Sequence, residues 1–405
     1  MRRNRFFPAA ALCLLLTASL PGCRRAEPAS VARIDTLPGG VLRVTSDAPT
    51  GWRDSTHAWK VKETLRIQPP EGAPGELIDP GQLAVDAQGR IYLSDQKPVV
   101  IKVFDSTGVL VRTIGREGGG PGEYHVALIA VRGERLVVHD PSLARTTVFD
   151  TAGTYLRSWP SSCCYWADIG IDSASRIYLP SMVVPDSGKP TRGRAYSRYG
   201  MDGMLVDTLY VPEQADMKSW TFTSGTGTNK RSTMIMNVPF TPMTSFALHP
   251  DGGFVRGWTG EYRIVRAPRG EDSTMVMSRK WIADAIPGAM RTELVEKVVT
   301  NATQSVGEAA ARGVARLGDV PTSAPAFTSL KVDMDGNVWA RRLVGSDSTW
   351  VTFDVFSPDG MWLGPLTVPF AIPQWGGQFF GHGAIYAVIE DADGRPAIVK
   401  LKLEQ

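Results

Sequence analysis

Apolar and polar residues alternate in short runs along most of the chain, and turn residues separate the runs. The clearest unit extends from Gly81 to Ile114 and contains four such runs. Residues 86–90 and 105–108 form two of its boundaries, where aspartate can bond its own backbone and glycine accepts positive φ. β-Branched and aromatic residues fill the runs, as half-buried antiparallel strands require. The unit predicts a four-stranded antiparallel sheet.

The same pattern recurs further along the chain. Four more units have the same arrangement: Val126 to Trp159, Ala167 to Val211, Thr244 to Trp281, and Phe327 to Val368. The last unit, Trp375 to Leu403, has room for only three strands, whereas Trp59 to Ile67 alternates like a strand and has no unit of its own. The repeat predicts an all-β fold, a six-bladed β-propeller with four antiparallel strands per blade, whose N-terminal strand closes the last blade. Residues 213–243 hold a further possible hairpin, so a seventh blade remains an alternative.

One stretch departs from the β pattern. Between Ala289 and Leu317 the apolar residues keep a near four-residue spacing, which predicts an amphipathic helix or a broken pair of helices. We place this α-helical insert at residues 284–325, between blades 4 and 5. In propellers, a connection from an outer strand to the next inner strand reaches the face that carries the channel mouth. We therefore expect the insert to cover part of the mouth.

The first blade also resembles a known repeat. The segment from Pro80 to Tyr124 is similar to an NHL repeat, and the likeness is carried by residues 83–86, 89–95, 103–105, 108 and 114–124. Asp95 recurs as Asp140 but has no counterpart in the third unit, so the later blades depart from the repeat. The whole chain resembles the NHL-type six-bladed β-propeller lipoproteins of bacteria, which implies the same fold and an envelope location.

The N-terminus has the pattern of an export signal. Three arginines precede an apolar run from Phe6 to Leu16, which is shorter than the roughly 20 residues that a membrane span needs. Residues 20–23 resemble the lipobox of bacterial lipoproteins. We therefore predict that residues 1–22 are removed, that Cys23 is lipidated, that residues 23–58 form the lipidated N-terminus and tether, and that the propeller occupies residues 59–405. By the same resemblance, Arg24 after the cysteine favours the outer membrane.

Charge changes the picture once the signal is removed. The full chain has 44 basic and 41 acidic side chains. Removal of residues 1–22 takes away three arginines and no acid, so 44 − 3 leaves 41 basic side chains and a formal net charge of zero. A nucleic-acid partner requires a concentrated basic face, and we expect none. The predicted contact with the membrane runs through the N-terminal lipid.

Candidate ligand-binding residues lie where the loops of a propeller converge on the channel mouth. The loops predicted to reach this face offer Glu123, Tyr124, His125, Arg145, Cys163, Cys164, Trp166, Arg192, Arg194, Phe327 and Trp375. Aromatic and arginine side chains together suit peptides, glycans or anionic groups. Loops that bind nothing carry the same residue types, so both interpretations stay open.

Cys163 and Cys164 are the sharpest local feature among these candidates. Cys13 lies in the predicted signal and Cys23 is predicted to carry lipid, which leaves two adjacent thiols in an oxidising compartment. Adjacent cysteines can form a disulfide only by distorting the peptide between them. A vicinal disulfide and a pair of reduced, packed thiols are both consistent with the sequence.

Catalysis finds less support than binding in the sequence. The five histidines are spread over both predicted faces, so they do not supply three converging metal ligands. Asp86, Asp172, Asp251 and Asp335 fall in turns, where turn formation accounts for them. We predict no metal and no cofactor. We favour a monomeric binding or scaffold module for an envelope protein, a peptide or a glycan; the alternative is a metal-dependent propeller hydrolase or lyase.

Overall fold

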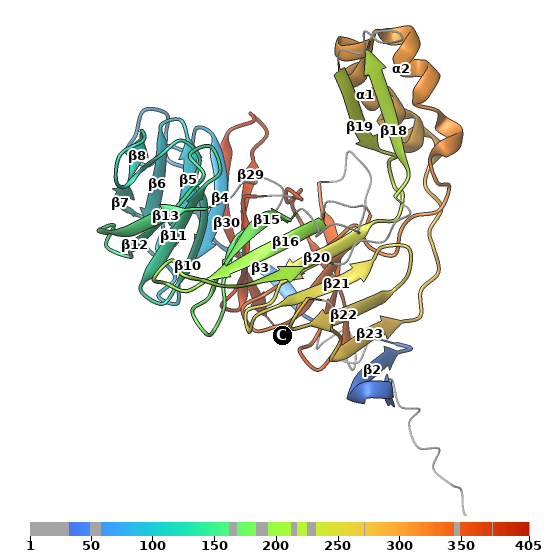
Figure 1. Ribbon diagram of the computed structural model, residues 1–405, viewed down its shortest axis with the longest axis horizontal. Helices are drawn as coiled ribbons and strands as arrows, with labels where there is room; N and C mark the ends of the chain where they lie inside the picture. The colour runs from blue at the N-terminus through green and yellow to red at the C-terminus, as the bar shows by residue number, and fades with distance from the viewer. Residues whose placement is uncertain are drawn as a thin grey trace, which may run out of the picture. The chain divides into compact units, whose positions relative to one another are not determined.

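The computed structural model describes residues 32–48, 58–161, 168–183, 193–211, 217–224, 232–270, 272–343, 349–374 and 376–404. Within these residues, six sheets form a six-bladed β-propeller (Figure 1). The prediction of an all-β propeller is confirmed. The hairpin at residues 219–237 stays a separate two-stranded sheet, so it is not a seventh blade.

The first three blades follow one another in the sequence. Blade 1 contains β4 (Pro80–Val85), β5 (Ile91–Gln96), β6 (Val99–Phe104) and β7 (Leu110–Ile114). Blade 2 contains β10 (Leu128–Arg132), β11 (Arg135–Asp140), β12 (Arg145–Asp150) and β13 (Tyr155–Pro160). Blade 3 contains β14 (Gly170–Ile171), β15 (Ile177–Val183), β16 (Gly193–Tyr199) and β17 (Leu205–Tyr210). A short parallel pair, β8 (Arg116–Glu117) and β9 (Glu123–Tyr124), lies between blades 1 and 2.

The last three blades complete the ring. Blade 4 contains β20 (Thr244–Leu248), β21 (Phe254–Trp258), β22 (Arg263–Ala267) and β23 (Met275–Arg279). Blade 5 contains β24 (Ser329–Val332), β25 (Val338–Arg341), β26 (Val351–Phe356) and β27 (Trp362–Val368). Blade 6 contains β28 (Gln378–Gly381), β29 (Ala384–Glu390), β30 (Pro396–Glu404) and β3 (Lys60–Ile67).

The N-terminal strand closes the ring as the sequence predicts. Strand β3 pairs antiparallel with β30, from Lys60 opposite Glu404 to Ile67 opposite Ile398. Ile67 is buried in the hydrophobic cluster that blades 6 and 1 share, together with Ile91 and Tyr386. Each of the other five contacts between neighbouring blades also has its own apolar cluster. The core of the propeller is therefore divided among the six blade interfaces.

Turn residues explain why the first and second strands of a blade pair where they do. Asp86 accepts hydrogen bonds through Oδ1 from the backbone of Gln88 and Arg90, at 3.0 and 2.9 Å. Asp172 caps the equivalent turn of blade 3 in the same way. In blade 5 the capping residue is Asp333 rather than Asp335. In blade 4 it is His249, whose Nδ1 accepts a hydrogen bond from the backbone of Asp251.

The segment assigned to the tether contains an additional hairpin. Strands β1 (Ala32–Leu37) and β2 (Val41–Ser46) flank a 3₁₀ turn at Pro38–Gly40. Strand β2 pairs parallel with β23, so blade 4 becomes part of a six-stranded sheet. Val44 is buried against this sheet. Residues 32–46 therefore belong to the fold, and the tether predicted for residues 23–58 is not a continuous linker.

The helical insert lies between blades 4 and 5 as predicted. Helix α1 (Gly288–Val306) and helix α2 (Glu308–Val314) are separated by Gly307, and a 3₁₀ turn follows at Leu317–Asp319. The helices pack on the hairpin of β18 (Ser219–Ser224) and β19 (Ser232–Asn237), with Trp220 and Phe222 at the contact (Figure 1). Among the described residues, no helix is long and apolar enough to cross a membrane.

Ring closure gives the first testable prediction. Ile67→Ala removes buried methyl groups from the interface of blades 6 and 1, so we expect it to lower the free energy of unfolding by about 2–4 kcal/mol in urea denaturation. Lys62→Ala, at an exposed position of the same strand, should change it by less than about 0.5 kcal/mol. Similar values for the two variants would mean that β3 does not hold the ring closed.

Candidate functional site

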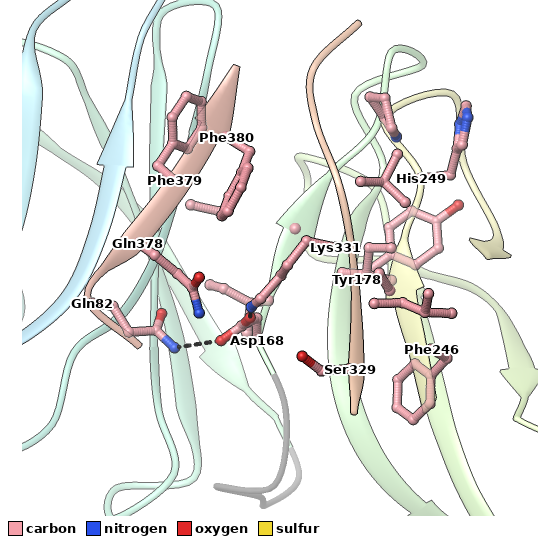
Figure 2. A pocket seen from close by; sticks show the side chains of 18 of the residues that line it. Gln82, Asp168, Tyr178, Phe246, His249, Ser329, Lys331, Gln378, Phe379 and Phe380 are labelled. Atoms are coloured by element: carbon pink, nitrogen blue, oxygen red, sulfur yellow. Dashed lines mark hydrogen bonds and ion pairs between the residues drawn. The ribbon is translucent and has the colours of Figure 1, made fainter. Parts of the chain in front are cut away.

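The channel at the centre of the propeller contains a cavity of about 250 Å³. Residues of the inner strands β4, β10, β14, β20, β24 and β28 line it, so every blade contributes to its wall (Figure 2). The shape of the cavity therefore depends on the whole ring of blades. A concave site with a few converging polar groups is the usual form of a binding site for a small ligand or an end group.

A polar cluster crosses this cavity. The carboxylate of Asp168, which precedes β14, accepts hydrogen bonds from Lys331 Nζ at 2.8 Å and from Gln82 Nε2 at 3.2 Å (Figure 2). The Asp168 side chain is 44 % exposed and that of Lys331 18 %. Because solvent reaches the Asp168 carboxylate, screening limits the stabilisation from this partly buried ion pair to roughly 1 kcal/mol. The pair therefore contributes chemistry to the cavity rather than much stability.

Neighbouring groups hold this cluster in place. Gln82 Oε1 accepts a hydrogen bond from the backbone of Ile129 at 3.0 Å, and Tyr196 donates to the backbone carbonyl of Asp168 at 2.9 Å. Lys331 lies on β24 of blade 5. Residues of blades 1 and 5 thus bind the Asp168 carboxylate, while residues of blades 2 and 3 hold Gln82 and the Asp168 backbone. An ammonium has three donors, so Lys331 can bind a ligand oxygen while it keeps its bond to Asp168.

Aromatic side chains form the apolar part of the wall. Phe246, Phe379 and Phe380 line the cavity, and Figure 2 shows Phe246 on the opposite side of the view from Phe379 and Phe380. The Arg194 guanidinium lies 5.2 Å from the Phe246 ring centroid. An aromatic face beside charged and amide groups favours a ligand that has both a polar edge and an apolar face.

His249 and Tyr178 add further polar groups to the cavity wall. Burial lowers the pKa of His249 to about 4, and the charge of Arg266 acts in the same direction while Asp251 opposes it. Burial also raises the pKa of Tyr178, whose hydroxyl donates to Asp172 at 3.0 Å. Both side chains are therefore uncharged at neutral pH. Asp172 and Arg194 also line the cavity, so its ionisable groups are not confined to the part that carries Asp168 and Lys331.

The structure places the sequence-predicted candidates in different environments. Arg194 lines the cavity. Arg145 instead donates to the carbonyls of Gly119, Gly120 and Glu123, and so holds the loop between blades 1 and 2. Glu123 accepts a hydrogen bond from the backbone of Gly120 at 2.7 Å. These contacts give Arg145 and Glu123 a structural role in the loop.

The remaining candidates lie outside the cavity wall or outside the described residues. Tyr124 is buried and donates its hydroxyl to the carbonyl of Ile114. The exposed side chain of His125 lies 4.0 Å from Glu117, and Phe327 is buried between blades 4 and 5 against Tyr262. None of these three lines the cavity. The candidates outside the described residues are Cys163, Cys164, Trp166, Arg192 and Trp375.

The helical insert, which we expected to cover part of the mouth, contributes no described residue to the cavity wall. No described residue of α1 or α2 lines the cavity, because the apolar faces of the helices pack on β18 and β19. The three residues of the polar cluster in the cavity, Gln82, Asp168 and Lys331, are not among the candidates predicted from the sequence. They lie on or next to inner strands, whereas we searched for candidates only in the segments that the sequence assigned to loops. A comparison of equivalent inner-strand positions across the repeats could have found them.

A second histidine forms a buried cluster in blade 2. His139 Nδ1 lies 3.0 Å from Thr146 Oγ1 and 3.2 Å from Ser161 Oγ, and burial lowers the pKa of His139 to about 4. Its Nε2 has no hydrogen-bond partner among the described residues. A catalytic serine and histidine need substrate access and a group that orients the base. This cluster therefore resembles a buried structural network more than a hydrolytic site.

Metal ligands do not converge in the described part of the chain. No group of three histidine, cysteine, aspartate or glutamate residues there could hold a metal ion. In the cavity, Asp168 and His249 lie toward opposite ends (Figure 2).

Comparisons with known proteins concern the fold. No protein-family model matches the chain, and no curated protein matches its sequence. A Bacteroides fragilis protein described as exported is 12% identical, with a TM-score of 0.48, over 90% of this chain and 100% of that one. A DUF4221 family member from Bacteroides vulgatus is 10% identical, with a TM-score of 0.49, over 86% of this chain and 99% of that one. Streptogramin B lyase is 10% identical, with a TM-score of 0.40, over 85% and 98%. Similarities this low carry no argument about function.

The lowered pKa of His249 predicts a pH dependence of stability. In the unfolded chain this side chain binds a proton near the ordinary histidine pKa of 6.5, whereas in the folded protein it does so near 4. Stability is therefore retained above pH 6.5 and falls as the pH decreases from 6.5 to 4. His249→Asn keeps an acceptor for the Asp251 backbone but cannot titrate, so its free energy of unfolding should fall less steeply over this window. Parallel curves for the two proteins would contradict the assignment.

Proposed function

We propose that this chain is an exported, lipid-anchored envelope module that binds the end group of a peptide or a glycan in the propeller channel. The observation that carries the proposal is the cavity between the inner strands, with the Lys331, Asp168 and Gln82 cluster in its wall. Donors and acceptors that are already held in place lose little conformational entropy when a ligand binds.

The size of the cavity indicates how such a ligand binds. A volume of about 250 Å³ accommodates one side chain or one sugar ring rather than a folded partner. The end group therefore enters the channel, and the rest of the ligand lies outside it. Phe246 offers an apolar face to the end group, while Lys331 and Gln82 offer donors to its oxygen atoms.

The alternative is a metal-dependent hydrolase or lyase. That chemistry needs about three protein ligands on one side of an ion. In the described cavity wall the candidates are Asp168, Asp172 and His249. Asp172 is engaged by its turn and by Tyr178, and His249 caps its own turn. The geometry therefore supports binding better than metal-assisted catalysis.

Binding is tested with the mature lipoprotein in detergent. After a peptide and glycan array identifies a ligand, calorimetry measures its Kd with Lys331→Met, which removes the cavity ammonium, and with Ser329→Phe, which fills the cavity. We expect either change to weaken binding about tenfold or more, since charge-assisted hydrogen bonds and cavity contacts are lost. Lys62→Met, on an exposed part of β3, should bind within about twofold of the unmodified protein.

Two results would contradict the channel site. The first is an unchanged Kd in both cavity variants, provided that thermal unfolding shows them folded. The second is an array on which no peptide or glycan is retained by the unmodified protein. Weaker binding in Ser329→Phe with unchanged binding in Lys331→Met would keep the cavity but remove the proposed role of the ammonium.

Lipid attachment has its own test. Cys23 is proposed to carry the acyl chains, and two or three chains would hold the protein firmly at a membrane because each buried methylene contributes about 0.8 kcal/mol. Metabolic labelling with an alkyne fatty acid should mark the unmodified protein and Cys13→Ala, but not Cys23→Ala. Label on Cys23→Ala, or its absence from the unmodified protein, would remove the anchor from the proposal.

A further inference from the structure

A second cavity, of about 600 Å³, lies where the helical insert joins blades 4 and 5. The segments that connect the insert to the propeller form most of its wall, namely residues 279–282 and 284–287 from the end of β23 onward and residues 324–326 on the return. The rest of the wall consists of Met290 of α1, Arg342 and Leu343 after β25, Trp362 of β27, and residues 47–48 after β2. The channel cavity shares none of these residues. The two sites are therefore separate.

A buried carboxylate organises the base of this second cavity. Asp354 accepts hydrogen bonds from Arg342 Nε and Nη2 at 2.8 and 2.7 Å, and from Arg279 Nη2 at 2.9 Å. Tyr262 and Trp362 donate to the same carboxylate at 2.6 and 3.0 Å. Burial alone raises the pKa of Asp354, but the hydrogen bonds from Arg342 and the charges of both arginines together lower it. The carboxylate is therefore ionised.

The charges in this cluster do not cancel. Two guanidinium groups share one carboxylate, so the cluster carries one excess positive charge. The side chain of Arg279 is only 10% exposed, and its guanidinium carbon lies 4.2 Å from the Tyr262 ring centroid and 4.4 Å from that of Trp362. Its Nε has no hydrogen-bond partner among the described residues. A buried, unbalanced cation is costly unless an anion is close.

Arg342 is positioned to meet such an anion. It lines the cavity, its side chain is 37% exposed, and it uses Nε and Nη2 for Asp354. No described residue accepts a hydrogen bond from its Nη1. Arg342 therefore combines a fixed orientation, set by Asp354, with a donor that remains available at the cavity surface.

The rest of the wall is largely apolar. Trp281, Ile286, Met290 and Leu343 line the cavity. Lys280, Asp47 and Asp284 line it as well, and all three are exposed. Water and salt weaken their charges, although the pKa of Arg342 is raised first by its hydrogen bond to Asp354 and also by the charge of Asp284. The site thus has a positive base and an apolar wall, with the solvated charges at exposed positions.

From this geometry we infer a binding site for an amphiphilic monocarboxylate, a molecule with one carboxylate head and an apolar body. The head accepts a hydrogen bond from Arg342 Nη1, which Asp354 holds at the cavity surface. The apolar body lies against Ile286, Met290 and Leu343.

Occupation of this site would also affect the insert. The two segments that connect the insert to the propeller pair with each other, through Ile286 N to the carbonyl of Thr322 at 2.8 Å and Ala324 N to that of Asp284 at 2.8 Å. Residues of both segments line the cavity. A ligand there contacts both sides of the connection, so we expect the backbone amide of Ile286 to exchange more slowly when the site is filled.

The test uses the mature lipoprotein in detergent and decanoate, below its micelle concentration, as the probe. Calorimetry should show saturable binding with one site, and decan-1-ol, which lacks the charge, should bind at least about tenfold more weakly. Arg342→Gln should weaken decanoate binding by a similar factor. Met290→Trp, which fills the cavity and leaves the arginines intact, should do the same, whereas Lys331→Met in the channel should leave Kd unchanged.

The variants keep the inference falsifiable if one of them does not fold. Should Arg342→Gln unfold, Met290→Trp and the comparison of decanoate with decan-1-ol still decide the matter. No saturable decanoate binding, equal binding of the acid and the alcohol, or a Kd unchanged by Met290→Trp would each overturn the site. Slower exchange at Ile286 on addition of decanoate would support the assignment, and exchange unchanged at saturation would contradict it.

Discussion

The pairing of β3 with β30 is the constraint on which the rest of this molecule depends. It joins residues 60–67 to residues 398–404, at opposite ends of the sequence, and buries Ile67 between blades 6 and 1. A propeller that lacks this strand has an open edge and an incomplete last blade. Each neighbouring pair of blades shares its own apolar cluster. Five of these interfaces join blades that follow one another in the sequence, whereas the interface of blades 6 and 1 joins the two ends of the propeller, and β3 stabilises that one.

Ring closure also creates the channel site. The inner strands of all six blades surround the channel cavity, so Gln82, Asp168 and Lys331 meet only when the ring is complete. The second cavity lies between blades 4 and 5, where Arg279 and Arg342 converge on Asp354. In both places a carboxylate holds cationic side chains in a fixed position. The difference is burial: Asp168 is half-exposed beside one lysine, whereas Asp354 is fully buried and shared by two arginines.

The sequence predicts the architecture better than the site. Turn residues such as Asp86 and Asp172 mark the strand boundaries locally, and the unpaired strand at residues 59–67 predicts closure because an incomplete blade needs a partner. The hairpin at residues 32–46 was missed, since its pairing with β23 is a long-range contact that no local pattern reports. The sequence assigns Arg145 to a loop and gives it the residue type of a ligand-binding group. In the structure it begins β12 and donates to three backbone carbonyls, contacts that only the folded chain shows. Likewise, only the assembled ring brings Asp168 and Lys331 together, because the two residues are 163 positions apart in the sequence.

The central claim is that the channel cavity is where a ligand binds. The most direct measurement is a crystal structure of the protein with the peptide or glycan that it retains. We expect an end group inside the channel, with a ligand oxygen within hydrogen-bond distance of Lys331 Nζ and an apolar face against Phe246. A ligand bound on the outer surface of the blades, with the channel unaltered, would contradict this claim.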